Sequence, residues 1–228
     1  MRLIGLTGGI GTGKTTVSNY LNQIYQFPIW DADIYAREAV QPGSPILGNI
    51  VEHYGQNIIL PDGNLDRQQL GEIVFNNQQE LHWLEKQIHP YVRHRFEENI
   101  KHFIIKNSEF NDKKFQQIIS DQTTSQNFTV VLVIPLLFEA KMTDLVTEIW
   151  VIYTTLQQQI ERLMKRDCLT EKQAYTRINN QMSLAEKCEK ADIVVDNSST
   201  LDVLLKKVDS AIADQQNNSV SGLKKNLN

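Results

Sequence analysis

Eight residues near the N-terminus have the types and spacing of a phosphate-binding loop. Residues 8–15 read Gly-Gly-Ile-Gly-Thr-Gly-Lys-Thr and fit the pattern G-x-x-x-x-G-K-[ST]. The preceding residues 2–7 predict a short buried strand, and Val17, Leu21 and Ile24 have helical spacing after the loop. In this setting the backbone N–H groups turn inward, and the helix N-terminus adds partial positive charge. The stretch therefore predicts nucleotide binding, and a simple glycine-rich turn is the disfavoured alternative.

Two side chains of this loop have expected chemical roles. Lys14 is expected to reach the β- and γ-phosphates of the nucleotide, and the Thr15 hydroxyl to take one position on Mg²⁺. These roles identify a phosphate donor site but do not say which reaction follows.

Two carboxylates, Asp31 and Asp33, follow a second predicted strand at residues 27–31. Asp33 is well placed as the N-cap of a predicted helix over residues 34–40, which is its structural role. Ligands of a parallel α/β sheet sit at the carboxyl ends of the strands, so Asp33 is also placed to orient an attacking hydroxyl or to hold the Mg²⁺ shell. Judged alone, the two readings have equal weight, and Asp31 together with Arg37 favours the functional one.

A pair of arginines follows the strand predicted at residues 149–153. Arg162 and Arg166 are spaced i,i+4 and share a helix face, and Arg177 and Gln181 repeat this spacing in the next predicted helix. A charged helix surface is the alternative. We favour a lid, because a kinase needs mobile cations to neutralise the transferring phosphoryl group.

The remaining pattern predicts one α/β fold. Further buried strands at residues 129–134, 149–153 and 193–195 bring the total to five, separated by helices, which indicates a doubly wound parallel sheet. Residues 46–106 have helical periodicity, with Asp66 as an expected N-cap and Pro90 expected to kink or divide the last helix. A helical insertion of this kind usually builds a substrate pocket.

Composition excludes several classes. The chain has 228 residues, 41% hydrophobic, and a net charge of −4, which gives no basic field for nucleic acid. No apolar run approaches the ~18 residues of a membrane span. Cys168 and Cys188 are isolated, which favours a reduced cytosolic setting and a packing role. Residues 107–128 form a polar excursion, partly helical at 115–119, and the tail from Gln215 is expected to be disordered.

Taken together, these stretches resemble the dephospho-CoA kinase family from residue 1 to about 212, apart from residues 107–128. The phosphate loop alone is common to many families, and the specific signal is a set of further stretches in this order and spacing. They are Asp31-Ala32-Asp33 with Arg37, Asp62-Gly63-Asn64-Leu65-Asp66-Arg67 with Val74-Phe75, Ile88-His89-Pro90, Pro135-Leu136-Leu137-Phe138-Glu139, Arg162 with Arg166-Asp167, Arg177 with Gln181, and Ala191-Asp192 with Asp196-Asn197.

The resemblance implies a single P-loop kinase domain, residues 1–214, similar to nucleoside monophosphate kinases. Its parallel core is expected at 1–41 and 129–214, a helical acceptor-binding insertion at 42–106, the polar excursion at 107–128, a lid at 155–185, and a disordered tail at 215–228. Residues 107–128 are longer than the family's usual link, and Ser198-Ser199 departs from its usual Asn or Gly, without an expected loss of activity.

The implied reaction is transfer of the ATP γ-phosphate to the ribose 3′-hydroxyl of dephospho-CoA, the last step of coenzyme A synthesis. Mg²⁺ is the expected cofactor with Thr15 as its ligand, and the enzyme is expected in the cytoplasm as a monomer or weak homo-oligomer, without nucleic-acid or membrane partners. The expected residues are Asp33, Lys14, Arg162 and Arg166 for catalysis; Gly9, Ile10, Gly11, Thr12, Gly13, Lys14, Thr15 and Thr16 for ATP; and Asp33, Arg37 and His89 for the acceptor.

Other nucleotide-binding classes fit the sequence less well. The closest alternative is another P-loop small-molecule kinase, acting on a nucleoside monophosphate or a small hydroxy compound. A GTP-dependent switch needs an Asn-Lys-x-Asp tetrapeptide, which is absent. An ATP-driven motor normally carries an acid at the end of a downstream buried strand, where this chain has Pro135.

Overall fold

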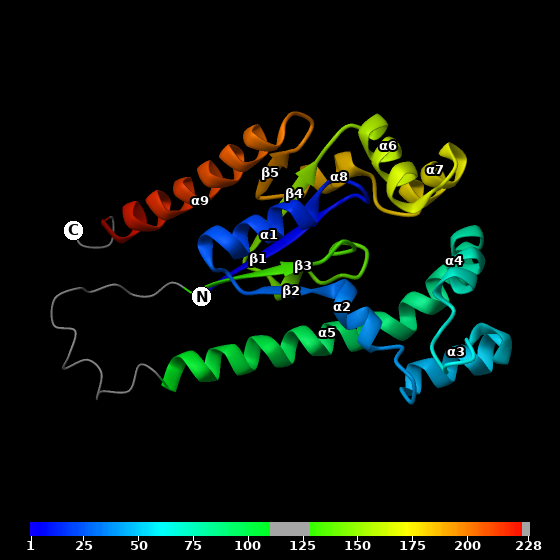
Figure 1. Ribbon diagram of the computed structural model, residues 1–228. Coiled ribbons are helices and arrows are strands. Elements are labelled where there is room, and N and C mark those ends of the chain that lie inside the picture. The colour runs from blue at the N-terminus through cyan, green and yellow to red at the C-terminus, as the bar shows by residue number, and fades with distance from the viewer. Residues whose placement is uncertain (110–127, 225–228) are drawn as a thin grey trace. The chain divides into compact units, whose positions relative to one another are not determined.

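The computed structural model describes residues 1–109 and 128–224, without the side chains of 108–109 and 215–224 (Figure 1). The chain divides into two compact units. The sheet unit comprises Leu3–Ile29 and Val130–Asn228, and the helical unit comprises Met1–Arg2 and Trp30–Thr129. In the part of the chain that is described, no helix is long and apolar enough to cross a membrane.

Five strands form one parallel sheet, as the sequence predicts. The order across the sheet is β2-β3-β1-β4-β5. In β1 and β4, Gly8 lies opposite Ile152, so the phosphate loop begins level with the carboxyl end of β4. The strands are β1 (Arg2–Gly8), β2 (Ile29–Asp31), β3 (Thr129–Val133), β4 (Glu148–Tyr153) and β5 (Ile193–Asp196).

Two helices pack on one face of this sheet and close the core of the sheet unit (Figure 1). They are α1 (Lys14–Tyr25) and α9 (Leu201–Lys224). Their apolar side chains pack with those of the strands, and each fully buried Leu or Ile contributes about 1.5–3 kcal/mol. The buried cluster includes Ile4, Leu6, Val17, Leu21, Trp150, Leu204, Val208 and Ile212.

Helix α9 is longer than the sequence predicts. It continues through residues 215–224, where the polar composition predicts a disordered tail, and residues 225–228 lie outside the described residues. Once Leu204, Val208 and Ile212 anchor a helix on the core, each added residue costs little, because nucleation has already been achieved.

The helical unit contains α2 (Ala32–Glu38), α3 (Pro45–Tyr54), the short 3₁₀ helix η1 (Gln56–Ile58), α4 (Arg67–Asn76) and α5 (Gln78–Glu109). The expected cap is confirmed, since the Asp66 carboxylate accepts from the amides of Gln68 and Gln69. Helix α5 passes through Pro90 as one element, so the predicted division there is wrong. The buried Val92 and Phe96 hold the turns that follow the proline.

This unit begins earlier than the predicted insertion boundary at residue 42. Helix α2 packs on α5, where the rings of Tyr35 and Phe96 lie 5.0 Å apart, and Asn99 donates to the Tyr35 hydroxyl at 2.5 Å. Arg95 of α5 also pairs with Glu38 of α2 at 3.2 Å. The segment that carries Asp33 therefore folds with the helical unit.

Three helices follow β4 in the sheet unit: α6 (Leu156–Asp167), α7 (Glu171–Asn179) and α8 (Leu184–Glu189). Each begins with a capping box, built on Thr155, Thr170 and Ser183 respectively. The 3₁₀ helix η2 (Thr143–Leu145) lies between β3 and β4. Of the polar excursion, residues 107–109 belong to α5, while residues 110–127, including the helix predicted at 115–119, lie outside the described residues.

Candidate functional site

The phosphate loop connects β1 to α1 and depends on its glycines. Gly13 has φ +95°, and a Cβ there would lie 2.3 Å from Nδ2 of Asn197. This backbone conformation is costly for any other residue. The amides of Gly11, Gly13 and Thr15 make no hydrogen bond within residues 1–109 and 128–224. These donors sit at a helix N-terminus, which suits an anionic ligand.

Lys14 and Thr15 face different partners in this loop. The Lys14 ammonium donates to the carbonyl oxygens of Gly8 at 3.0 Å and Gly9 at 2.8 Å. The Thr15 side chain is exposed, and its hydroxyl makes no hydrogen bond to the described residues. The Lys14 ammonium thus bonds the first residues of the loop, whereas the Thr15 hydroxyl faces solvent.

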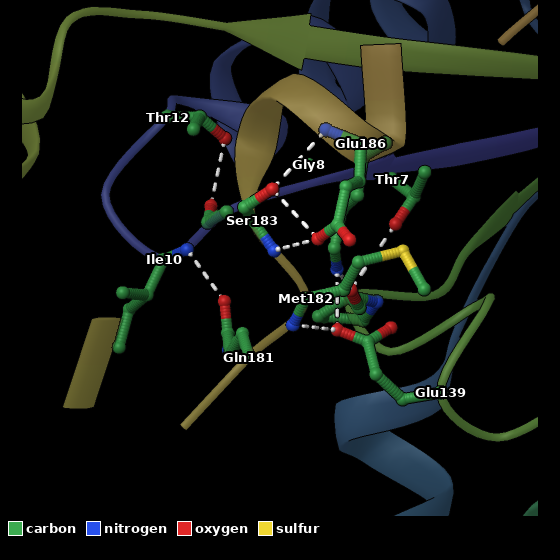
Figure 2. Close-up of polar contacts among 12 residues, drawn as sticks. Thr7, Gly8, Ile10, Thr12, Glu139, Gln181, Met182, Ser183 and Glu186 are labelled. Carbon is green, nitrogen blue, oxygen red and sulfur yellow. Dashed lines mark hydrogen bonds and ion pairs between the residues drawn. The ribbon is translucent and has the colours of Figure 1, made fainter. Parts of the chain in front are cut away.

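Side chains from α6 and from the segments beyond it hold the loop backbone in place. Gln159 donates to the Ile10 carbonyl at 2.7 Å. Figure 2 shows Gln181, which accepts from the Ile10 amide at 3.0 Å. Asn197 donates to the Thr12 carbonyl at 2.8 Å. The shape of the loop is therefore fixed by side-chain hydrogen bonds as well as by its glycines.

The predicted lid arginines have different surroundings. Arg162 donates to the carbonyl oxygens of Gly11 at 3.4 Å and Asn197 at 3.2 Å, so its guanidinium lies beside the loop. Arg166 instead forms two hydrogen bonds with Asp167, at 2.7 and 3.0 Å. Arg177 pairs with the same carboxylate at 3.1 Å. The hydrogen bond from Arg166 and the nearby guanidinium charges hold the pKa of Asp167 below its usual range.

The predicted helical spacing of Arg177 and Gln181 is wrong. Helix α7 ends at Asn179, and Gln181 lies in the linker that leads into α8. There its side chain reaches the loop amide of Ile10 instead of extending the arginine face.

In the helical unit, Asp31 caps α2, which corrects the structural role expected for Asp33. The Asp31 carboxylate accepts from the Asp33 amide at 2.8 Å, and Asp33 lies in the first turn. The Asp33 side chain is exposed and makes no hydrogen bond or ion pair with the described residues. The capping alternative for Asp33 is therefore removed, and its carboxylate is available for another role.

The other predicted acceptor residues lie in the same unit as Asp33. Arg37 lies in the last turn of α2, and its exposed guanidinium has no hydrogen bond or ion pair among the residues described. His89 is half-buried in α5. Arg67 donates to the Arg37 carbonyl at 3.4 Å. Partial burial and the neighbouring charge of Arg37 lower the pKa of Arg67.

Sequence reasoning did not predict the loop contacts of Gln159, Gln181 and Asn197, although Gln181 and Asn197 lie in stretches that carry the family resemblance. Gln159 has no motif around it, and its role follows only from the position of α6 beside the loop. The packing role predicted for the cysteines is wrong for Cys168, which is exposed at the end of α6 with φ +53°. Cys188 is half-buried, and burial raises the pKa of its thiol.

Comparison with known proteins shows the family to which this sequence belongs. The family model for dephospho-CoA kinase matches residues 2–112 and 110–202. The chain belongs to the dephospho-CoA kinase family. The dephospho-CoA kinase of Trichormus variabilis is 54% identical over 211 residues, covering 92% of this chain and 96% of that protein. That of Synechocystis sp. is 53% identical over 197 residues, covering 86% and 88%.

Solved structures of kinases have the same fold. Dephospho-CoA kinase from Campylobacter jejuni matches with a TM-score of 0.65 at 25% identity, covering 96% of this chain and 100% of that one. Shikimate kinase from Acinetobacter baumannii in complex with shikimate matches with a TM-score of 0.50 at 14% identity, covering 94% of each chain, and shares the fold alone. The chain is therefore a P-loop kinase that uses ATP, and its sequence belongs to the dephospho-CoA kinase family.

The residues of the loop suit Mg²⁺ carried by a nucleotide. Among the described residues there is no group of three or more His, Cys, Asp or Glu that could hold a metal ion. Mg²⁺ bound together with phosphates needs few protein ligands, because phosphate oxygens and waters fill most of its positions. The exposed Thr15 hydroxyl meets that requirement.

Proposed function

We propose that this chain transfers the γ-phosphate of ATP to the ribose 3′-hydroxyl of dephospho-CoA, giving coenzyme A and ADP. The observation that carries the proposal is the family match across residues 2–202, combined with a phosphate loop whose amides are available as donors. In an in-line transfer the γ-phosphorus forms a bond to the 3′-oxygen and breaks its bond to the bridging oxygen of ADP.

On the donor side, Lys14 exchanges partners when ATP binds. Its ammonium leaves the carbonyls of Gly8 and Gly9, 3.0 and 2.8 Å away, and bonds the β- and γ-phosphate oxygens. Charge-assisted bonds to phosphate are stronger than bonds to neutral carbonyls, so the exchange favours the bound state. Thr15 holds Mg²⁺, which, when bound, neutralises phosphate charge.

On the acceptor side, Asp33 receives or orients the proton of the 3′-hydroxyl. Support comes from its exposed carboxylate, which is not used in capping α2. A carboxylate that accepts no hydrogen bond from the protein keeps all its lone pairs for the substrate hydroxyl and is more basic than one held by an amide.

The acceptor carries a diphosphate, and Arg37 with Arg67 offers a site of opposite charge. Their charges repel each other, and an anion between them would relieve that repulsion. Planar guanidinium groups bind phosphate oxygens in pairs, which orients the ligand as well as attracting it. His89 contributes to the same acceptor region.

Arg162 and Arg166 neutralise charge on the transferring phosphoryl group. Arg162 already lies beside the loop carbonyl of Gly11. Arg166 is 59% exposed and must leave Asp167 to take part, so its contribution comes with movement of the lid.

The chemistry requires no membrane or nucleic-acid partner, and we expect a monomer or weak homo-oligomer. A cytoplasmic location fits the two free cysteines, Cys168 and Cys188, since such thiols persist in reducing compartments.

The test is a substrate panel. ADP release is measured with dephospho-CoA, with several nucleoside monophosphates, with shikimate and with gluconate. We expect rapid release with dephospho-CoA alone, and a phosphate ester on the ribose 3′-oxygen of the product by ³¹P NMR. Release with a nucleoside monophosphate or small hydroxy compound, but none with dephospho-CoA, would identify the alternative small-molecule kinase.

A further inference from the structure

A buried ion pair lies next to the segment that contacts the phosphate loop. Lys187 of α8 is fully buried, and its ammonium lies 2.8 Å from Oε1 of Glu139 and 2.8 Å from the Pro135 carbonyl. The Thr7 hydroxyl donates to the same carbonyl at 3.1 Å. The pair thus joins α8 to the segment after β3, and the shared Pro135 carbonyl links both to the carboxyl end of β1.

The same carboxylate oxygen holds the linker between α7 and α8. The Met182 amide donates to Oε1 of Glu139 at 2.9 Å (Figure 2). On the C-terminal side, Ser183 caps α8 by accepting from the Glu186 amide at 3.2 Å. On the N-terminal side, Gln181 accepts from the Ile10 amide at 3.0 Å. Gln181, which contacts the loop, therefore directly precedes Met182, whose amide donates to Glu139.

This linker also forms part of a cavity wall in the sheet unit. The cavity has a volume of about 560 Å³ and extends from the loop to α8, and its lining includes Gly9, Thr154, Gln159, Gln181, Met182 and Ser183. A shift of the linker therefore changes both the loop and the space beside it.

We propose that Glu139, Lys187 and Gln181 are positioning residues for ATP binding. The buried pair fixes residues 181–183, and Gln181 carries that constraint to the Ile10 peptide, whose carbonyl Gln159 holds from the other side. The loop then keeps the shape in which its later amides meet phosphate. This inference rests on the proposed function, because it assumes that the loop binds ATP.

The surroundings of Glu139 decide which substitution can test the inference. Oε2 is buried and has no hydrogen-bond partner among the described residues. Glu139→Gln is unsuitable, because it would place an amide NH2 at this buried position and leave the buried Lys187 ammonium without its carboxylate. Glu139→Ala removes the acceptor, and pairing it with Lys187→Met avoids leaving a buried ammonium without its carboxylate.

The experiment is a double-mutant cycle on the Kd for ATP, measured by calorimetry. Gln181→Met and the combined variant E139A/K187M are each expected to raise the Kd about tenfold, the size of one lost hydrogen bond with its amide left unpaired. The triple variant is expected to remain near tenfold, because both changes break the same connection. The KM for dephospho-CoA is expected to stay unchanged throughout.

A purely structural role gives different results. Tyr20→Phe is the matched control, since it removes a 2.8 Å hydrogen bond to Asp209 that joins α1 and α9, and it should lower Tm without changing the Kd. An additive, about hundredfold loss in the triple variant, or a lower Tm with unchanged Kd in E139A/K187M, would overturn the inference. If the wild-type protein fails to bind ATP, the proposed function itself fails instead.

Discussion

The two groups of functional residues differ in how the protein holds them. In the sheet unit, the loop carbonyls of Ile10 and Thr12 and the Ile10 amide are all bonded to side chains from later in the chain. In the helical unit, Asp33 and Arg37 lie on a firmly packed helix, but their charged groups make no hydrogen bond or ion pair with the described residues.

The contrast indicates a division of work between the units. A loop that is already shaped before ATP arrives loses little entropy on binding and requires little reorganisation. In the proposed reaction, the exposed groups of α2 instead acquire their partners from the acceptor. Variants in the sheet unit should therefore change ATP affinity, whereas variants of Asp33 and Arg37 should change turnover or acceptor binding.

The largest effect is expected for Lys14→Ala. It removes the cation of the prebuilt donor site, so both ATP affinity and turnover should fall, with kcat/KM reduced by about 10³-fold or more. Steady-state kinetics with dephospho-CoA as acceptor, together with a direct measurement of the Kd for ATP, checks this. A variant with wild-type ATP affinity would contradict the role given to Lys14.

Asp33→Asn should change turnover without changing ATP affinity, and so distinguish the α2 residues from the loop residues. Losing the proposed proton acceptor should lower kcat by on the order of 10²-fold, while the Kd for ATP stays unchanged, because the loop lies in the other unit and keeps its own contacts. Single-turnover kinetics and calorimetry measure the two quantities. Near-normal turnover would remove Asp33 from the mechanism.

Arg166→Ala tests a side chain of the sheet unit that bonds a neighbouring carboxylate. Its guanidinium now bonds Asp167, so a contribution to turnover requires it to change partners. We expect kcat to fall about tenfold or somewhat more, the size of a charge-assisted hydrogen bond, with Tm almost unchanged. A lower Tm with normal kcat would indicate a purely structural arginine.

Gly13→Ala tests whether ATP affinity depends on the shape of the phosphate loop or only on backbone strain at a left-handed glycine. A Cβ at Gly13 meets Asn197 at 2.3 Å, whereas Gly43 has a similar φ of +86° with no atom within 4 Å of its Cβ position. Both variants should lose about 1–3 kcal/mol of stability from the left-handed backbone. Only Gly13→Ala should also raise the Kd for ATP, by about tenfold. An equal rise in Gly43→Ala would contradict the specific role of the loop.

These residues also show how far sequence alone reaches. The phosphate loop and the strands were predictable, because Gly13 and the buried runs have requirements that few residue types meet. The contacts of Gln159 and Gln181 were not, since a glutamine on a helix or linker has no spacing that reveals a partner more than a hundred residues away. The sequence favours Asp33 as the N-cap of α2, whereas the structure has Asp31 there. Both are good capping residues, and only the backbone angles of Asp31 decide between them.

The smallest effect concerns Asp167, whose carboxylate pairs with Arg166 of α6 and Arg177 of α7. The hydrogen bond from Arg166 lowers the pKa of Asp167, so the carboxylate stabilises the fold above the ordinary aspartate pKa near 4, and the stabilisation is lost as pH falls through the lowered value. Because Arg166 is 59% exposed, the contribution is limited to about 1 kcal/mol, or roughly 2–4 °C in Tm. Asp167→Asn should therefore melt slightly below wild type at pH 7, and the difference should close as the pH is lowered below about 4. A difference that grows in acid would mean that the Asp167 carboxylate does not stabilise the fold through these arginines.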